Sequence, residues 1–265
     1  MIDHKSIVIT GASNGIGAAL ATQLAQPGRQ LALIGRDPGR LQSVTNQCQL
    51  QGADCIAASI DVRDAQRLST FVEEVERHRP IDLLICNAGI LDGRRADQVV
   101  ENGTVAREVL EINLLSAIDL LHQVLPAMRR RGSGGIVLVA SLASFVPLAD
   151  APAYSASKAG LMSYGMALRD AVGAEGVQVT VACPGYVSTG MAKMHKGPRP
   201  NEISAERAAA LILSGFRRNA GLVGFPVVPF WLSRVSLLVP EAVRRFASKG
   251  TRFHVSDDQT SAASR

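Results

Sequence analysis

Short, almost continuously apolar runs alternate with longer segments of mixed polarity along this chain. Strands that are covered on both faces of a parallel sheet have this character, because both alternating sets of side chains are buried. Each run contains four to six residues, which fits a buried strand. The predicted strands are Ser6–Thr10, Leu31–Ile34, Ile56–Ile60, Ile81–Cys86, Ile136–Ala140 and Val177–Ala182.

The segments between these runs have the length and pattern of helices. The predicted helices are Ile16–Gln26, Arg40–Gln51, Ala65–Arg77, Val105–Arg130, Ala153–Val172 and Ala205–Arg218. Regular alternation of strand and helix predicts right-handed βαβ units and a parallel sheet with helices on both faces. We therefore expect an α/β fold in one domain over residues 1–255, in which 191–250 form a substrate loop and a C-terminal cap. Residues 256–265 are small and polar, and we expect a flexible tail there.

Composition restricts the class of protein to an ordinary globular chain. Apolar residues make up 47% of the 265 residues and charged residues 19%, which argues against a disordered chain. The four cysteines, Cys48, Cys55, Cys86 and Cys183, form no CxxC pair. They therefore lack the spacing typical of zinc sites, and they do not indicate a disulfide framework. We expect no metal ion. A reducing compartment fits these cysteines, and the N-terminus shows no signal peptide, so we predict a cytoplasmic protein.

The net charge of +5 raises the question of a nucleic-acid partner. Aromatic residues make up only 4% of the chain, too few for the stacking platforms that bind single-stranded nucleic acids. The arginine triplet 129–131 lies at the predicted end of a helix, where cations complement the helix dipole. We expect no nucleic-acid partner; a binding patch at the triplet is the alternative interpretation.

The segment Gly221–Pro240 is rich in apolar residues but contains three prolines and Arg234. A membrane-spanning helix needs about 20 predominantly apolar residues, and these interruptions argue against one. The segment fits a last strand, followed by loops and a helix that cover a substrate pocket. The alternative is a peripheral surface that binds a membrane or an acyl chain through Phe230–Leu232 and Leu237–Val239.

A glycine-rich stretch, Thr10–Gly17 (TGASNGIG), follows the first predicted strand and opens the first predicted helix. Its glycines allow a tight turn and let backbone N–H groups approach a pyrophosphate at the helix N-terminus. The spacing is GxxxGxG rather than the commoner GxGxxG, so the motif alone also fits a plain tight turn. Its place between strand and helix favours a dinucleotide. The predicted contacts are Gly11, Ser13, Asn14, Gly15, Ile16 and Gly17.

The end of the second predicted strand indicates which dinucleotide is preferred. An acidic residue there binds the ribose 2′-hydroxyl of NAD, whereas an arginine accommodates the 2′-phosphate of NADP. Gly35 leaves room, and the Arg36 guanidinium can pair with phosphate or stack on adenine. Asp37 follows, where it can also cap the next helix. We predict a preference for NADP(H), with NAD(H) still usable; a solvated surface arginine is the alternative interpretation of Arg36.

Further ligand contacts are predicted where the third and fourth strands end. Open α/β sheets bind ligands at the carboxyl ends of their strands. The residues at these ends are Asp61 and Val62, then Asn87, Ala88 and Gly89.

Tyr154 and Lys158 are four residues apart, so on a helix they share one face. A cation beside a phenol favours the phenolate, so we expect a lowered pKa for Tyr154 and proton exchange with an alcohol. Ser141 closes the fifth strand, where its hydroxyl can bind the reacting carbonyl oxygen; a plain helix cap is the alternative. Asn113 is a polar residue between Ile112 and Leu114 that helix formation leaves unexplained.

These residues together resemble the short-chain dehydrogenases/reductases in their compact form, from about Lys5 to Met191. The motifs that carry the resemblance are TGASNGIG (Thr10–Gly17), Asp61-Val62, NAG (Asn87–Gly89), Asn113, Ser141, YSASK (Tyr154–Lys158) and PGYVST (Pro184–Thr189). The resemblance implies a Rossmann-type doubly wound sheet of about seven strands in the order 3-2-1-4-5-6-7. It also implies a homodimer or homotetramer, in which the helices predicted at Val105–Arg130 and Ala153–Val172 pair with their copies.

The resemblance further implies a role for each site residue. Tyr154 would be the acid/base, Lys158 would bind the nicotinamide ribose, and Ser141 would orient the substrate. Asn113 would hold a proton-relay water. Asn14 stands where many NADP-dependent members carry a basic residue, so the NADP prediction depends on Arg36 alone. Residues implied to face the nicotinamide are Pro184, Gly185, Val187 and Thr189.

The expected function is an oxidoreductase that interconverts a carbonyl and a secondary alcohol by hydride transfer. An epimerase or dehydratase with the same residues is one alternative, and the compact length argues against it. A non-catalytic NADP-binding regulator is another, and the intact Ser141, Tyr154 and Lys158 set argues against it. The apolar segment suggests a small apolar substrate. An anionic group on it would fit the basic residues Lys193, His195, Lys196 and Arg199, which also fit a solvated loop.

Overall fold

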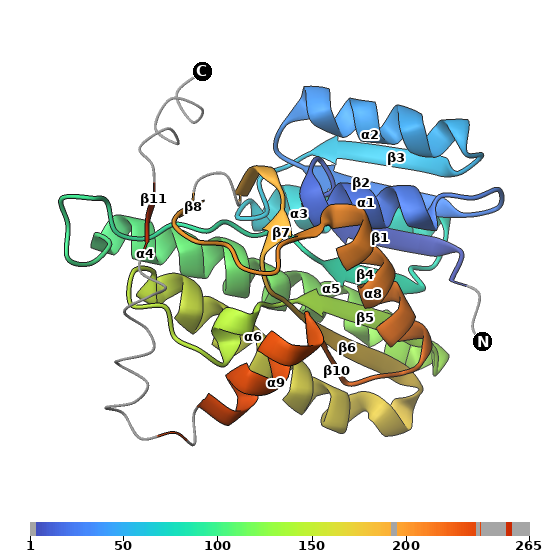
Figure 1. Ribbon diagram of the computed structural model, residues 1–265. Helices are drawn as coiled ribbons and strands as arrows, with labels where there is room; N and C mark the ends of the chain where they lie inside the picture. The colour runs from blue at the N-terminus through green and yellow to red at the C-terminus, as the bar shows by residue number, and fades with distance from the viewer. Residues whose placement is uncertain (1–3, 192–194, 237–238, 240–252, 256–265) are drawn as a thin grey trace.

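The computed structural model describes residues 4–191, 195–236, 239 and 253–255. Its main feature is a seven-stranded sheet in the order β10-β6-β5-β4-β1-β2-β3, with every neighbouring pair parallel (Figure 1). The strands are β1 (Ser6–Thr10), β2 (Gln30–Gly35), β3 (Asp54–Ser59), β4 (Leu83–Cys86), β5 (Gly134–Val139), β6 (Val177–Pro184) and β10 (Leu222–Phe225). The predicted doubly wound order is confirmed, with β10 as the seventh strand.

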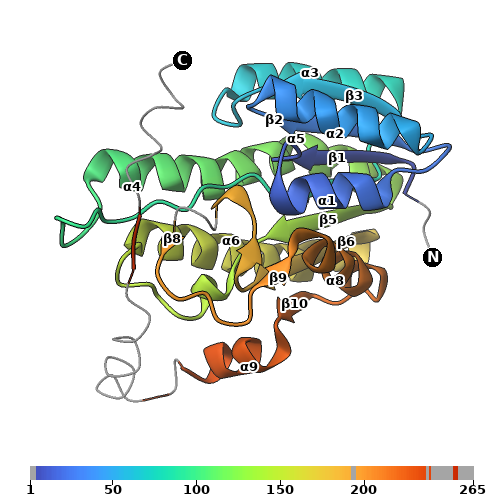
Figure 2. The same ribbon diagram turned by 45° about the horizontal axis from the view of Figure 1, so that its top comes forward.

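Helices cover both faces of the sheet (Figures 1 and 2). They are α1 (Gly15–Leu24), α2 (Pro38–Leu50), α3 (Ala65–His78), α4 (Gly103–Leu110), α5 (Ser116–Arg131), α6 (Pro152–Val172), α8 (Ala205–Arg217) and α9 (Val227–Ser236). Side chains alternate across a strand, so Ile7 and Ile9 pack with α1, α2 and α8, whereas Val8 packs with α3, α5 and α6. Both sets are fully buried, which explains the continuous apolar run of β1.

The outer ends of the predicted elements lie within two residues of the observed ones. The strand predicted from Ile81 begins at Leu83. The Asp82 backbone still bonds to both neighbouring strands, since its N–H donates to the Ser6 carbonyl oxygen and its carbonyl oxygen accepts from the Gly135 N–H, each at 2.8 Å. The Ile81 N–H donates to Glu76, and the Asp82 carboxylate accepts from the N–H groups of Lys5 and Ser6. Side-chain bonds of this kind join the start of β4 to α3 and β1, and hydropathy does not reveal them.

The helix predicted at Val105–Arg130 is interrupted by a π-helical turn, Glu111–Leu115, between α4 and α5. The stretch Gly103–Arg131 is long and apolar enough to span a bilayer by length and composition, and half of its apolar window is buried in the fold. A buried core helix passes the same test, so this stretch is weak evidence for a membrane span.

Two small sheets lie beyond the carboxyl edge of the main sheet. β7 (Val187–Ser188) pairs in parallel with β9 (Ile203–Ser204), and β8 (His195–Lys196) pairs antiparallel with β11 (His254–Val255). The strand and helix expected within Gly221–Pro240 are present as β10 and α9. Of the substrate loop and cap predicted over 191–250, residues 192–194, 237–238 and 240–250 lie outside the described residues, as does the tail predicted over 256–265.

Candidate active site

The glycine stretch forms a tight connection between β1 and α1. Gly11 and Gly15 have φ angles of +67° and +55°, a region that favours glycine. A Cβ on Gly17 would lie 2.1 Å from the carbonyl oxygen of Gly11, so no larger residue fits there. The exposed Asn14 caps α1 by accepting from the Gly15 N–H at 2.7 Å. The connection therefore brings an accessible helix N-terminus to the carboxyl edge of the sheet.

The end of β4 is bonded directly to this connection. The Asn87 amide donates to the carbonyl oxygens of Thr10 and Gly11 at 3.0 and 3.2 Å. The Thr10 hydroxyl accepts from the N–H groups of Asn87 and Ala88, each at 3.0 Å. A Cβ on Gly89 would lie 3.1 Å from the Asn113 amide oxygen and 3.2 Å from the Lys158 amine. The Asn87–Gly89 segment thus joins the glycine connection to Asn113 and Lys158.

Two charged residues, Arg36 and Asp37, directly follow β2. Asp37 caps α2, accepting from the Arg40 N–H at 2.9 Å, and its carboxylate also pairs with the Arg40 guanidinium at 3.1 Å. This confirms the helix-cap interpretation of Asp37. Arg36 is exposed at the sheet edge. The structure thus gives Asp37 a capping role at α2, while the Arg36 side chain beside it is exposed.

Asp61, at the end of β3, is held by a neighbouring arginine. Arg63 donates to both of its carboxylate oxygens, at 3.1 and 2.6 Å, and extends to Glu108 at 3.2 Å. The Arg63 hydrogen bonds hold the pKa of Asp61 below its ordinary value, and the charge of Arg36 acts in the same direction. Val62 beside it is buried. Asp61 is therefore an ionised, oriented acceptor at the same edge as Arg36.

Tyr154 and Lys158 lie on the first turns of α6, both within the buried interior. The Lys158 amine is 5.9 Å from the centre of the Tyr154 ring and donates to the carbonyl oxygen of Val139 at 2.9 Å. Only 4% of Lys158 is exposed, and burial lowers its pKa from 10.5 to about 8. The predicted sharing of one helix face is therefore observed, and the amine is the buried cation of this cluster.

The expected lowering of the Tyr154 pKa is not observed. Burial raises the pKa of Tyr154 above 10.0, and the hydrogen bond with Ser141 opposes that rise without cancelling it. The physical reason is that the phenol is only 9% exposed, so its anion loses hydration. The i, i+4 spacing of a cation and a phenol does not reveal this desolvation.

Ser141 caps a short turn, as the alternative interpretation of this residue predicts, and it also bonds to Tyr154. Its side chain accepts from the Ala143 N–H at 3.1 Å, capping a short 3₁₀ turn over Leu142–Ser144. The same hydroxyl is the one that bonds to Tyr154. Ser144, in that turn, donates to the Lys158 carbonyl oxygen at 2.8 Å, so the turn after β5 is fixed against α6.

Asn113 is fully buried in the π-helical turn and joins three segments. Its amide oxygen accepts from the Ile90 N–H at 2.7 Å, and its amide nitrogen donates to the Ile90 carbonyl oxygen at 2.9 Å. The nitrogen also reaches the Ser157 hydroxyl at 3.1 Å, which in turn donates to the Tyr154 carbonyl oxygen at 2.7 Å. A π-turn of this kind frequently occurs at functional sites, since it redirects one side chain out of helical register.

The Pro184–Thr189 segment lies at the carboxyl end of β6, at the same edge of the sheet. The Gly185 N–H donates to the Phe225 carbonyl oxygen at 2.8 Å, continuing the pairing of β6 with β10. Val187 is buried in β7. A Cβ on Gly15 would lie 2.8 Å from the Thr189 methyl group, so this segment lies over the start of α1. The predicted residues after β1, β4, β5 and β6 therefore surround one region.

Comparison with known proteins agrees with this geometry. The sequence pattern of the short chain dehydrogenase family matches residues 5–198. An uncharacterized oxidoreductase of Mycobacterium tuberculosis is 34% identical over 256 residues, 93% of this chain and 98% of that protein. This chain belongs to the short-chain dehydrogenases. It is therefore a member of a family of oxidoreductases.

Two further similarities bear on this short-chain dehydrogenase. The ketoacyl reductase HetN of Nostoc sp. is 39% identical over 190 residues, which are 71% of this chain and 65% of that protein. The chain thus spans slightly less than two thirds of that relative. A short-chain dehydrogenase from Sphingobium yanoikuyae, solved in complex with NADPH, has the same fold, with a TM-score of 0.76 and 22% identity. The structural match covers 96% of this chain and 99% of the Sphingobium yanoikuyae chain.

Sequence reasoning missed several residues that hold this dehydrogenase's site together. Thr10, Ser144 and Ser157 anchor neighbouring segments through their hydroxyls. The buried carboxylate of Glu101 accepts from the Ala153 N–H at 2.7 Å, and so caps α6 one residue before Tyr154. The sequence Ala151-Pro152 at the start of α6 could have indicated a cap from elsewhere in the chain. Neither residue can cap a helix with its own side chain.

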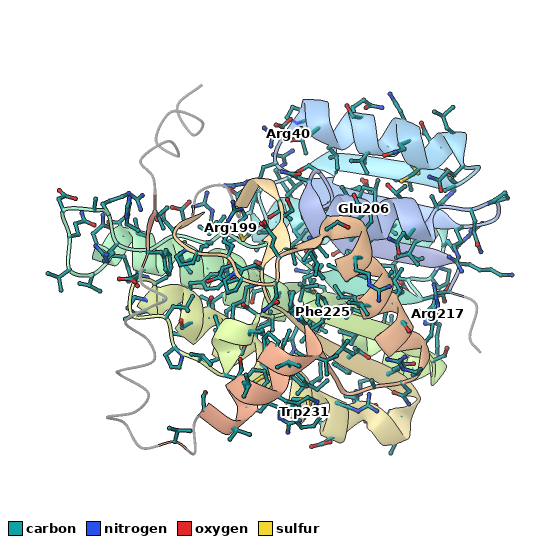
Figure 3. The ribbon with its side chains drawn as sticks, viewed as in Figure 1. Arg40, Arg199, Glu206, Arg217, Phe225 and Trp231 are labelled. Atoms are coloured by element: carbon teal, nitrogen blue, oxygen red, sulfur yellow. The ribbon has the colours of Figure 1, made fainter. Side chains whose placement is uncertain are left out.

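The α9 segment presents apolar side chains to solvent. Phe230 is buried against Phe145, whereas Trp231 is 56% exposed and Leu232 67%. Arg234 lies over the rings of both Phe230 and Trp231. Figure 3 shows Trp231 on the opposite side of the view from Arg40 on α2. Trp231 and Leu232 therefore form an exposed apolar part of α9.

Proposed function

We propose that this short-chain dehydrogenase interconverts a carbonyl and a secondary alcohol, with NADP(H) as its preferred cofactor. The observation that carries the proposal is the cluster of Ser141, Tyr154 and Lys158 beside the glycine connection. A buried phenol bonded to a hydroxyl, with a buried cation 5.9 Å from its ring, is suited to proton exchange with a bound oxygen atom.

The residues present fit a dinucleotide. The glycine connection has no room for side chains at Gly11 and Gly17, and the start of α1 offers accessible N–H donors for a pyrophosphate. Asp61 would accept hydrogen bonds at the adenine end. Arg36 would pair with the 2′-phosphate of NADP(H). Asp37 caps α2, so it is less suited to bind the ribose 2′-hydroxyl of NAD(H), and this supports NADP(H).

In reduction, the Tyr154 hydroxyl donates its proton to the carbonyl oxygen, and in oxidation the phenolate accepts the proton from the alcohol. When bound, NADP(H) supplies or accepts the hydride. Ser141 holds the same oxygen by hydrogen bonding. Lys158 stabilises the phenolate by its charge and would hold the nicotinamide ribose. Asn113 fixes the Tyr154 turn through Ser157 and would also place a proton-relay water.

The apolar side chains of β10 and α9 support an apolar substrate, and the ketoacyl reductase among the relatives adds ketoacyl thioesters to the candidates. The proposal includes a cytoplasmic homodimer or homotetramer built on α5 and α6, which are linked on their exposed side by a Tyr164–His122 hydrogen bond of 3.1 Å. Light scattering tests this assembly, and a monomer at micromolar concentration would contradict it.

The decisive experiment is NADPH oxidation with a panel of carbonyl compounds: 2-alkanones of increasing length, a cyclic ketone, a steroid ketone and a 3-ketoacyl thioester. The matched control is Tyr154→Phe, which removes one hydroxyl. Because general acid catalysis contributes about 10²–10⁴-fold, turnover is expected to fall in that range while NADPH binding persists. Equal turnover by both proteins would contradict the catalytic assignment, and no turnover on any compound would overturn the function.

A further inference from the structure

The C-terminal strand β11 returns to the active-site edge of the sheet. It pairs antiparallel with β8, and Figure 1 shows the two side by side. The Val255 N–H donates to the Arg94 carbonyl oxygen at 3.1 Å. The side chains of Phe253 and Val255 are 3% and 1% exposed, in the apolar cluster that also contains Tyr154. Residues 253–255, here called the C-terminal strap, are therefore packed into the fold.

One buried carboxylate connects the strap to two other segments. Asp150 is 1% exposed, and one of its oxygens accepts from the Arg94 guanidinium at 2.5 Å. The other oxygen accepts from the Phe253 N–H at 2.9 Å. The backbones also meet, since the Arg94 N–H donates to the Asp150 carbonyl oxygen at 2.9 Å. A Cβ on Gly93 would lie 2.3 Å from that oxygen, so the two loops are in direct contact.

The connected segments all surround the proposed reaction centre. Arg94 follows β4, Asp150 follows β5, and β8 follows β6, so each lies beyond a carboxyl end of the sheet, where ligands bind in this type of fold. Asp150 also precedes Tyr154 by four residues, with the start of α6 between them. The strap thus contacts three segments: the loop after β4, the loop that precedes α6 and Tyr154, and β8 in the loop after β6.

We propose that Asp150 is a positioning residue, which uses Arg94 and the strap to fix the loops that hold the substrate against Tyr154. The proposal rests on the carbonyl reductase function proposed above. Asp150 contacts Arg94 and the strap, which lie beyond the carboxyl ends of β4 and β6, so its effect is on substrate placement. It follows that loss of the connection raises KM for the carbonyl compound and leaves NADPH affinity unchanged.

The test compares Asp150→Asn with Asp170→Asn, which makes the same chemical change on the exposed end of α6. Asparagine keeps the size of Asp150 but places an amide where the Arg94 guanidinium needs a charged acceptor. The probe is the 2-alkanone that the wild-type enzyme reduces fastest. Because misplacement by about 1 Å can cost 100-fold, we expect Asp150→Asn to lower kcat/KM by about 10- to 100-fold, mainly through KM. Asp170→Asn should match the wild type.

A second pair of variants separates positioning from general damage. Arg94→Met removes the charge that faces Asp150, and Arg94→Lys keeps it, so lysine should recover part of the activity that methionine loses. Hydrogen exchange with saturating NADPH should show faster exchange at Phe253 and Val255 in Asp150→Asn, with the α6 core unchanged.

Each outcome decides the proposal. Unchanged KM, or unchanged exchange at Phe253, in Asp150→Asn overturns the positioning role while the proposed function stands. A parallel loss of NADPH affinity also overturns it, because the effect would then be a general loss of structure. A wild-type enzyme that reduces none of the carbonyl panel overturns the proposed function and this inference with it.

Discussion

Replacing Lys158 by methionine tests the electrostatic description of the site without any substrate. In the folded protein the pKa of the Lys158 amine is lowered to about 8 by burial, whereas the unfolded chain has the ordinary value of 10.5. Below pH 8 both states carry the charge, and the folded state bears a cost of about 3.4 kcal/mol. Above pH 10.5 both states are neutral and the cost is absent.

The sign follows from the protons bound by each state. Between pH 8 and 10.5 the unfolded chain binds more protons at Lys158, so the free energy of unfolding of the wild type rises with pH across this window. Methionine does not titrate. The stability of the wild type relative to Lys158→Met should therefore increase by about 2.5 kcal/mol between pH 7 and pH 10.

At pH 7 a second contribution acts in the opposite direction. The Lys158 amine donates to the Val139 carbonyl oxygen at 2.9 Å, and a buried acceptor left without this bond costs about 1–3 kcal/mol. Burial of the charge costs slightly more than this bond contributes. We therefore expect the Lys158→Met protein to be as stable as the wild type at pH 7, or more stable by up to about 2 kcal/mol.

The assay is urea unfolding followed by far-ultraviolet circular dichroism at pH 7, 8, 9 and 10, without cofactor. Lys5→Met, which removes a lysine charge at an exposed position, is the matched control. Parallel profiles for the wild type and Lys158→Met would refute the reasoning, as would a wild type that loses stability relative to the variant as pH rises.

Four further outcomes follow from the contacts described. Arg36→Ala should weaken NADPH binding about tenfold or more and NADH binding little, since a charge-assisted contact contributes about 1.5–3 kcal/mol; equal losses by titration would exclude Arg36 as the 2′-phosphate ligand. Gly17→Ala forces its Cβ to 2.1 Å from a carbonyl oxygen, so it should cost about 1–3 kcal/mol in urea unfolding and reduce NADPH affinity, whereas Gly103→Ala, with open space around it, should do neither. Glu101→Ala removes the cap of α6 and should destabilise the protein by about 1–2 kcal/mol, while Glu101→Gln keeps an acceptor and should retain most of the stability; equal losses would count against capping. Trp231 emission should shift to shorter wavelength with NADPH and a long 2-alkanone if α9 covers the substrate, and a shift with anionic vesicles alone would favour a membrane surface instead.

The order of elements and several site contacts could be predicted from the sequence because they depend on neighbours along the chain. Continuous apolar runs predict buried parallel strands, and β1 has the predicted bounds. The glycines of the first connection are required by local backbone geometry, at Gly11 and Gly15 through positive φ. Tyr154 and Lys158 share a face because helical periodicity places residues four apart together.

Tertiary structure decided whatever depends on residues distant in sequence. The direction of the Tyr154 pKa depends on how much of the phenol is removed from water, and no local pattern contains that quantity. Asn113 acquires its partners only because β4 and α6 converge on a π-helical turn. Asp150 lies 56 residues from Arg94 and 103 from Phe253, so its ion pair and its backbone contact exist only in the folded chain. Short-range geometry is encoded by adjacent residues, whereas burial and charge pairing arise when separate segments pack together.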